Sequence, residues 1–367
     1  MMITLPWRRR TADPGPSADT IVQAFERLGD NCEFGLVQRF CGAEPLGLFR
    51  FSGTTIAGLV HALDTDFAHY GSEDDLAILA SESGSLYCQS RRYGFAYTTS
   101  DLAASTEPGS ILGREVRKVA YLKRRLLEDL QAGEKILVRK GPAQESIGDA
   151  TALARAARRH GPSTLLWVRT ADANHPPGSV AWCADGVMEG RVRRFAQPET
   201  AYDIDLESWL DLCRGALRLA RGQPDPAPAP PPPNLLAKRS SRAGQHVLGQ
   251  AADGLCVFGA RQKTDRLAPR AIHVLSGWVW IPESFAGSRV GAAIGHYRHG
   301  FRDADLAVRD TWQRVWVAAQ IPPHFRDIMM GLVANGPAGA RLWSDGWRLE
   351  QGPVPSASPP PLKPPRS

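Results

Sequence analysis

The segment LGDNCEFGLVQRF, residues 28–40, places a cysteine where a helix is expected to begin. Asp30 and Asn31 are good N-cap residues, and apolar residues follow them at helical spacing. The unpaired N–H groups and the dipole of a first helical turn favour a thiolate, so Cys32 could act as a nucleophile. Glu33 opposes that ionisation with its negative charge, and free cysteines are commonly buried and inert. The segment leaves both a reactive and a structural Cys32 open.

A cysteine nucleophile needs a base, and four histidines of the first half are candidates: His61, His69, His160 and His175. His61 lies on an expected helix, and His69 has polar neighbours. His160 ends an expected helix, where a positive charge complements the helix dipole. His175 is the strongest candidate because it follows an expected strand, and loops at the carboxyl ends of parallel strands are where α/β sites assemble. Asp172 or Asp203 could orient its imidazole.

A second candidate site lies in TWQRVWVAAQI, residues 311–321. As a strand, it would carry Trp312, Arg314, Trp316 and Gln320 on one face and apolar residues on the other. Aromatic planes beside Arg and Gln can stack on a sugar and hydrogen-bond to it, and the same side chains can simply pack. Six tryptophans fall in three expected strands of this region, and those of residues 340–350 are expected to face the core.

The elements that would position Cys32 and His175 alternate between helix and strand. The apolar patterns predict helices and strands at residues 114–132, 135–141, 149–161, 163–170, 190–195 and 205–220. Strand, helix and strand in about 35 residues form a unit with parallel strands. Because residues 78–99 have the pattern of an antiparallel hairpin, we expect the mostly parallel sheet to be mixed. The alternation of helices and strands predicts an α/β domain.

The C-terminal region has short aromatic or β-branched segments separated by Gly, Pro or Asp turns, with no helical pattern. These segments are residues 271–282, 289–296, 311–322, 328–335 and 340–350. Strands at this spacing predict an all-β jelly roll or β-sandwich.

Proline-rich composition predicts the domain boundaries. Residues 222–233, GQPDPAPAPPPP, favour an extended spacer. They would join an α/β domain at 18–221 to a β-sandwich at 234–352. Residues 1–17 read as a disordered basic tail and residues 353–367 as a disordered proline-rich tail.

Composition excludes several classes of protein. The 367 residues carry a net charge of +6, but four of these charges lie in the terminal segments, which argues against nucleic acid as a partner. No run reaches the roughly 18 apolar residues of a membrane span. The start lacks a secretory pattern, and the six cysteines show no CxxC pair, so we expect free thiols, a cytoplasmic location and no metal or other cofactor.

The pattern Leu-Gly-x-Asn-Cys, residues 28–32, is followed by YLKRRLLEDLQAGEKILVRKG at 121–141 and TLLWVRTAD at 164–172. On these segments, residues 18–215 resemble a bacterial family of unknown function described as papain-like cysteine peptidases. Two features depart from that family. Many members have a Pro-Phe-Asp-Trp segment after the cysteine helix, where this chain reads PLGLFRF, and many carry a histidine where residues 93–101 read YGFAYTTSD.

The resemblance implies a hydrolase acting on an acyl or peptide bond. Cys32 would attack the carbonyl carbon, His175 would be the base, and helix N-terminal N–H groups would stabilise the oxyanion. Asn31, from the motif, and Asp172, as the orienting carboxylate, complete the candidate set. The C-terminal domain resembles jelly-roll modules fused to carbohydrate-active enzymes, so the expected partner is a glycan or a polypeptide substrate. Two alternatives stay open: an inactive binding or scaffolding protein of surface-polysaccharide metabolism, and a glycosyltransferase-associated protein.

Overall fold

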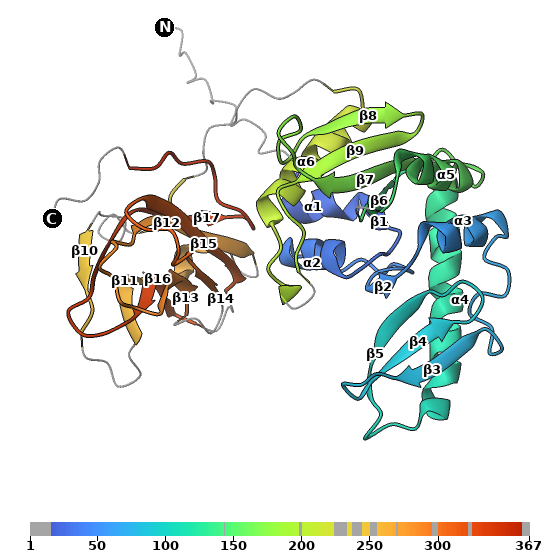
Figure 1. Ribbon diagram of the computed structural model, residues 1–367, viewed down its shortest axis with the longest axis horizontal. Coiled ribbons are helices and arrows are strands. Elements are labelled where there is room, and N and C mark those ends of the chain that lie inside the picture. Colours follow the sequence, from blue (N-terminus) through green and yellow to red (C-terminus); the bar gives the residue numbers. More distant parts are fainter. Residues whose placement is uncertain are drawn as a thin grey trace, which may run out of the picture.

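The chain forms an α/β part over residues 16–223 and an all-β part over residues 233–361 (Figure 1). The computed structural model describes residues 16–142, 144–197, 200–223, 233–236, 244–249, 255–268, 271–295, 300–321 and 325–361. Most of the predicted linker, residues 224–232, and of the predicted N-terminal tail, residues 1–15, lies outside the described residues.

A five-stranded sheet organises the α/β part in the order β1-β6-β7-β9-β8, with the first four strands parallel and β8 antiparallel. Its strands are β1 (Phe25–Arg27), β6 (Ile136–Lys140), β7 (Thr164–Thr170), β8 (Val180–Ala184) and β9 (Val187–Val192). The helices are α1 (Ala18–Gln23), α2 (Glu33–Phe40), α3 (Ile56–Asp64), α4 (Pro108–Ala132), α5 (Ile147–Arg158) and α6 (Leu206–Ala220). The predicted strand-helix-strand unit is confirmed as β6, α5 and β7.

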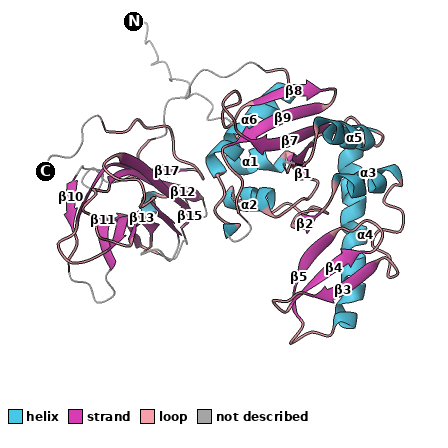
Figure 2. Ribbon diagram, in the orientation of Figure 1, coloured by secondary structure: helices cyan, strands magenta, loops and turns pink. Residues whose placement is uncertain are grey.

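The predicted hairpin at residues 78–99 forms strands, but it does not join the parallel sheet. It belongs to a separate antiparallel sheet in the order β2-β5-β4-β3, which lies beside the long helix α4 (Figure 2). These strands are β2 (Ser52–Gly53), β3 (Leu76–Ala80), β4 (Ser85–Ser90) and β5 (Ala96–Leu102). The main sheet is mixed, as expected, but its antiparallel strand is β8.

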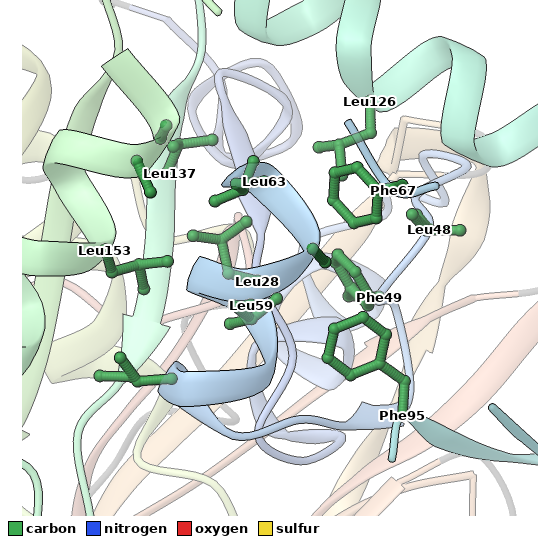
Figure 3. Packing of buried hydrophobic residues seen from close by; sticks show 14 of the residues in the cluster. Leu28, Leu48, Phe49, Leu59, Leu63, Phe67, Phe95, Leu126, Leu137 and Leu153 are labelled. Carbon is green, nitrogen blue, oxygen red and sulfur yellow. The ribbon is translucent and has the colours of Figure 1, made fainter. Parts of the chain in front are cut away.

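Helices cover both faces of the parallel sheet, which explains its continuous apolar strands. Leu137 and Leu165 point into the cluster built by α3, α4 and α5, whereas Val138 and Leu166 point into the cluster built by α1, α2 and α6. Figure 3 shows the first cluster, in which Leu28, Leu63 and Leu153 meet near the sheet and three phenylalanines extend it toward α4. The end of β1 therefore lies between the two clusters, with Phe25 in the second and Leu28 in the first, and α2 packs in the second.

The all-β part is a sandwich of two four-stranded antiparallel sheets, in the orders β10-β17-β12-β15 and β11-β16-β13-β14. Its strands are β10 (Gly244–Val247), β11 (Leu255–Lys263), β12 (Ile272–Trp280), β13 (Arg289–Ile294), β14 (Gly300–Asp303), β15 (Trp312–Gln320), β16 (Asp327–Asn335) and β17 (Arg341–Gln351). All five strands expected from the sequence are confirmed, and β10, β11 and β14 were missed. The two sheets enclose one apolar cluster.

A bulge in β17 separates two tryptophans that the sequence placed together in the core. Trp347 is 5 % exposed and packs in the sandwich core against Gly277, where a Cβ atom would collide with the indole ring. Between them the pairing with β12 shifts by one residue, and Gly346 there adopts a φ of 63°. Because a bulge reverses the side-chain alternation, Trp343 lies on the outer face instead.

The two parts touch through the outer face of β15 and the segment after β17. Trp316 and Val354 pack against the apolar cluster of α1, α2 and α6, and Arg302 pairs with Asp203 at 3.3 Å. In the segment after β17, the Ser356 N–H and hydroxyl both hydrogen-bond to the buried Glu350.

The first prediction concerns Trp316. Its replacement by alanine removes apolar surface that both parts bury, so the midpoint of thermal unfolding should fall, with a loss of about 2 kcal/mol. Differential scanning calorimetry measures it. The control is Trp182→Ala, because Trp182 on β8 is 46 % exposed. If both variants unfold like the parent protein, Trp316 does not stabilise the contact between the parts.

Candidate functional site

Three tryptophans from three strands form one row across the outer face of the sandwich. Trp280 on the central strand β12 lies directly opposite Trp312 of β15 on one side and opposite Trp343 of β17 on the other. All three are half-buried. The rings of Trp280 and Trp312 meet edge to face, with centroids 5.7 Å apart and planes at 71°. We call these three residues the tryptophan row.

Polar groups border the row. In the next outward-facing rank, Trp278 lies between Asp345 of β17 and Arg314 of β15. Residues two apart on a strand are separated by about 6.6 Å, so each of these charged groups stands one such step along its strand from a tryptophan of the row. An indole surface beside charged groups can offer a ligand both stacking and hydrogen bonds.

The four β15 residues predicted as ligand-binding share one face, but the structure places only Trp312 in the row and only Arg314 at its border. Arg314 donates to the Ser356 carbonyl oxygen, and Trp316 lies under Arg302 and against the α/β part. Gln320 is eight residues from Trp312, about 26 Å along the strand. Of the four, Trp312 alone belongs to the row. The sequence alone could not identify Trp280 and Trp343 as its neighbours, because the register between the strands determines which residues lie opposite each other.

Cys32 occupies the N-cap position of α2, at the carboxyl end of β1. Its side chain is exposed, and Asn31 Oδ1 accepts a 2.9 Å hydrogen bond from the Glu33 N–H. The predicted helix start is thus confirmed, one residue later than expected. The pKa of Cys32 is raised by partial desolvation, although the nearby Arg27 opposes this. A low-pKa thiolate, which the helix dipole suggested, does not follow from these surroundings.

Glu33 has a structural role that the sequence did not reveal. Its carboxylate is 2 % exposed, accepts a 3.0 Å hydrogen bond from Trp209 Nε1 on α6, and lies 3.3 Å from Lys140 Nζ on β6. Burial raises the pKa of this carboxyl, which these partners partly offset. Glu33 therefore links α2 to α6 and β6, and its carboxylate is not exposed to solvent beside Cys32.

His175 and Asp172 form the predicted pair in the loop after β7. His175 Nδ1 lies 2.8 Å from Asp172 Oδ1, and Arg191 also binds that carboxylate at 3.1 Å. The pair is exposed. Asp203 instead pairs with Arg194 and Arg302. Of the two carboxylates that the sequence left open, Asp172 is the one that contacts the imidazole.

The structure does not join this pair to the thiol. Strand β6 separates β1 from β7, a spacing of about 10 Å between the strands that carry the two groups. Among the described histidines none hydrogen-bonds to Cys32: His160, for example, binds the Leu63 carbonyl oxygen, and the ring of His61 packs at a tilt against Tyr93. Cys32 and His175 share one edge of the sheet without forming a dyad.

Strand β1 buries two neighbouring charges, Glu26 and Arg27, each 4 % exposed. Glu26 lies 3.7 Å from Lys135 Nζ and fills the space left by the missing side chain of Gly47. Desolvation raises its pKa to about 7, with Lys135 acting in the opposite direction. This carboxyl therefore changes charge near neutral pH.

Comparisons with known proteins give no family. No protein-family model and no curated protein matches the chain. Solved structures that match include the sugar-binding EclA C-terminal domain (8 % identity, 31 % of this chain and 81 % of that chain, TM-score 0.24). The CBM22-1 xylan-binding domain of Paenibacillus barcinonensis Xyn10C also matches (14 %, 34 % and 98 %, 0.23). A two-domain esterase active on acetylated mannans covers 62 % of this chain and 77 % of its own at 11 % identity and a TM-score of 0.16.

The described ranges show neither a membrane-spanning helix nor a metal centre. Every helix there is too short or too polar to cross a bilayer. The same ranges contain no group of three His, Cys, Asp or Glu side chains arranged to hold a metal ion.

The second prediction concerns the reactivity of Cys32. Because its pKa is raised, iodoacetamide at pH 7 should modify it no faster than a cysteine in a short peptide. Mass spectrometry of timed digests gives the rate, and exposed Cys183 serves as the internal reference. Labelling of Cys32 well above the peptide rate would show an activated thiolate.

The third prediction uses Glu26. A buried carboxyl with a raised pKa destabilises the fold once it ionises, so this penalty is absent below the ordinary pKa of 4.5 and complete above about 7. Relative to the parent, Glu26→Gln should gain stability over this pH range, by at most about 3 kcal/mol. Urea unfolding at several pH values measures the change. The control, Glu128→Gln, alters a 62 % exposed side chain, and a Glu26→Gln curve as flat as the control would contradict the assignment.

Proposed function

We propose that the β-sandwich binds a carbohydrate chain at the tryptophan row. The observation that carries this proposal is the register of β12, which puts Trp280 opposite both Trp312 and Trp343. The apolar face of a pyranose ring packs well on an indole, and a row across three strands can contact successive sugar units. Asp345 and Arg314, in the adjacent rank, supply an acceptor and a donor for sugar hydroxyls.

The stiffness of the row favours binding. The three indoles project from paired strands, so little backbone freedom is lost when a ligand binds. They are also half-buried, which restricts their rotamers before contact. A preformed aromatic surface of this kind suits an extended ligand that lies along the sheet.

A cysteine-dependent acyl hydrolase is the second candidate, for the α/β part. It is favoured by the exposed thiol at the start of α2 and by the His175–Asp172 pair on the same sheet edge. For His175 to deprotonate Cys32, its loop would have to move toward β1. An inactive binding or scaffolding protein needs no such movement.

The five described cysteines are free thiols, which supports a reducing compartment such as the cytoplasm.

The fourth prediction tests sugar binding. Trp280→Ala should weaken binding of a soluble polysaccharide at least about tenfold, because stacking on a central aromatic residue contributes more than 1 kcal/mol. Trp312→Ala and Trp343→Ala should weaken it as well. Affinity electrophoresis through gels containing xylan, galactomannan or mixed-linkage β-glucan gives the dissociation constants.

Trp182→Ala is the matched control, since it removes a partly exposed tryptophan from the α/β part. Retardation by at least one polysaccharide, lost in the row variants and kept in this control, supports the proposal. Loss of binding in Trp182→Ala but not in Trp280→Ala would move the site to the α/β part. Migration unaffected by any polysaccharide would count against a glycan site.

A further inference from the structure

Arg27 is a buried cation without a partner. It is 4 % exposed, and among the described residues its side chain has neither a hydrogen-bond acceptor nor an ion-pair partner. Its Nη1 atom is fully buried and has no acceptor. Its guanidinium faces the ring of Phe51 at 5.6 Å. Desolvation lowers the pKa of Arg27 to about 9, and the nearby Glu26 and Glu44 offset this only in part, so burial disfavours the unpaired cation.

Two more arginines converge on the same ring. Arg39 of α2 and Arg50 lie 5.2 and 4.9 Å from the centroid of Phe51. Arg50 also has a buried Nε without an acceptor. Three guanidinium groups around one ring concentrate positive charge at this point.

The cluster contains one carboxylate that pairs with two of these groups. Glu44 accepts a hydrogen bond from Arg39 Nε at 2.7 Å and forms an ion pair with Arg50. Its side chain is 54 % exposed, so it reaches in from the surface. Glu44 shows that the geometry holds an oxyanion, and it leaves Arg27 unpaired.

The beginning of α2 lies against the same cluster. A side chain at Gly35, in the first turn, would collide with both Arg27 Nη1 and the Phe51 ring. The helix dipole adds positive potential there, and Arg27 and Cys32 are near enough to influence each other electrostatically. The cluster reaches the surface at Arg39 and at Cys32.

We propose that Arg27, Arg39 and Arg50, gathered around Phe51, bind an oxyanion group of a small ligand, a phosphate or a carboxylate, beside Cys32. Planar guanidinium forks suit both groups through paired hydrogen bonds. The bound anion supplies the partner that Arg27 lacks, and it competes with Glu44 for Arg50. This site does not depend on the tryptophan row, which lies in the other part of the chain.

The test is protection of Cys32. The rate of its iodoacetamide labelling is measured with increasing inorganic phosphate or, separately, glucuronate, with sodium chloride holding ionic strength constant. At least one of the two anions should slow the labelling of Cys32 several-fold in a saturable manner and leave that of the exposed Cys183 unchanged. Protection by one anion identifies the ligand group as phosphate or carboxylate. Equal effects on both cysteines, or no effect of either anion, would overturn the proposal.

Three variants sharpen the test. Glu44→Gln removes the competing carboxylate, so protection should reach half its maximum at a lower anion concentration. Arg27→Met should abolish protection and, because it removes an unpaired buried charge, should raise the midpoint of thermal unfolding without anion. Arg117→Met, at an exposed position of α4, should behave like the parent. Unchanged protection in Arg27→Met, or weaker protection in Glu44→Gln, would show that the cluster is structural.

Discussion

The pairing of β12 with its two neighbours is the constraint on which the candidate glycan site depends. One strand sets the register of both β15 and β17, and that register alone puts Trp280 between Trp312 and Trp343. The bulge at Gly346 is part of the same constraint. Without it, Trp343 and Trp347 would share a face, and either the core would lose an indole or the row would lose one.

In the α/β part the main constraint is the burial of charged side chains at the carboxyl end of the sheet. Arg139 on β6 is 1 % exposed, but Thr54 and Glu145 accept its hydrogen bonds. Glu33 is buried with two donors. Arg27, one strand away from Arg139, has no such partner. This contrast within one sheet edge is what distinguishes a satisfied structural charge from a candidate ligand site.

The sequence predicted the elements better than their assembly. Strand-forming segments such as residues 328–335 and the helix ending at Gly133 were identified because periodicity and capping are local. The hairpin at 78–99 was assigned to the wrong sheet because strand pairing is not local. Sequence reasoning also paired His175 with Asp172, three residues apart, but could not decide whether β6 would separate them from Cys32.

The same limit explains what was missed in the candidate sites. Trp312, Arg314, Trp316 and Gln320 alternate on one face of β15 as predicted, yet Trp316 packs on another part of the chain and Gln320 lies far from Trp312. Nothing in the segment around Arg27 indicates that Phe51, more than twenty residues later, would meet it. A charged residue within a short apolar strand was the available signal.

The most direct test of the account is an NMR titration that follows the indole N–H resonances, assigned by single Trp→Phe variants. The ligand is an oligosaccharide of whichever polysaccharide binds most tightly. The account predicts saturable shifts for Trp280, Trp312 and Trp343, with a common dissociation constant, while the buried Trp167 and Trp209 stay fixed. Shifts centred on Trp182 or Trp316, with the row unchanged, would contradict it.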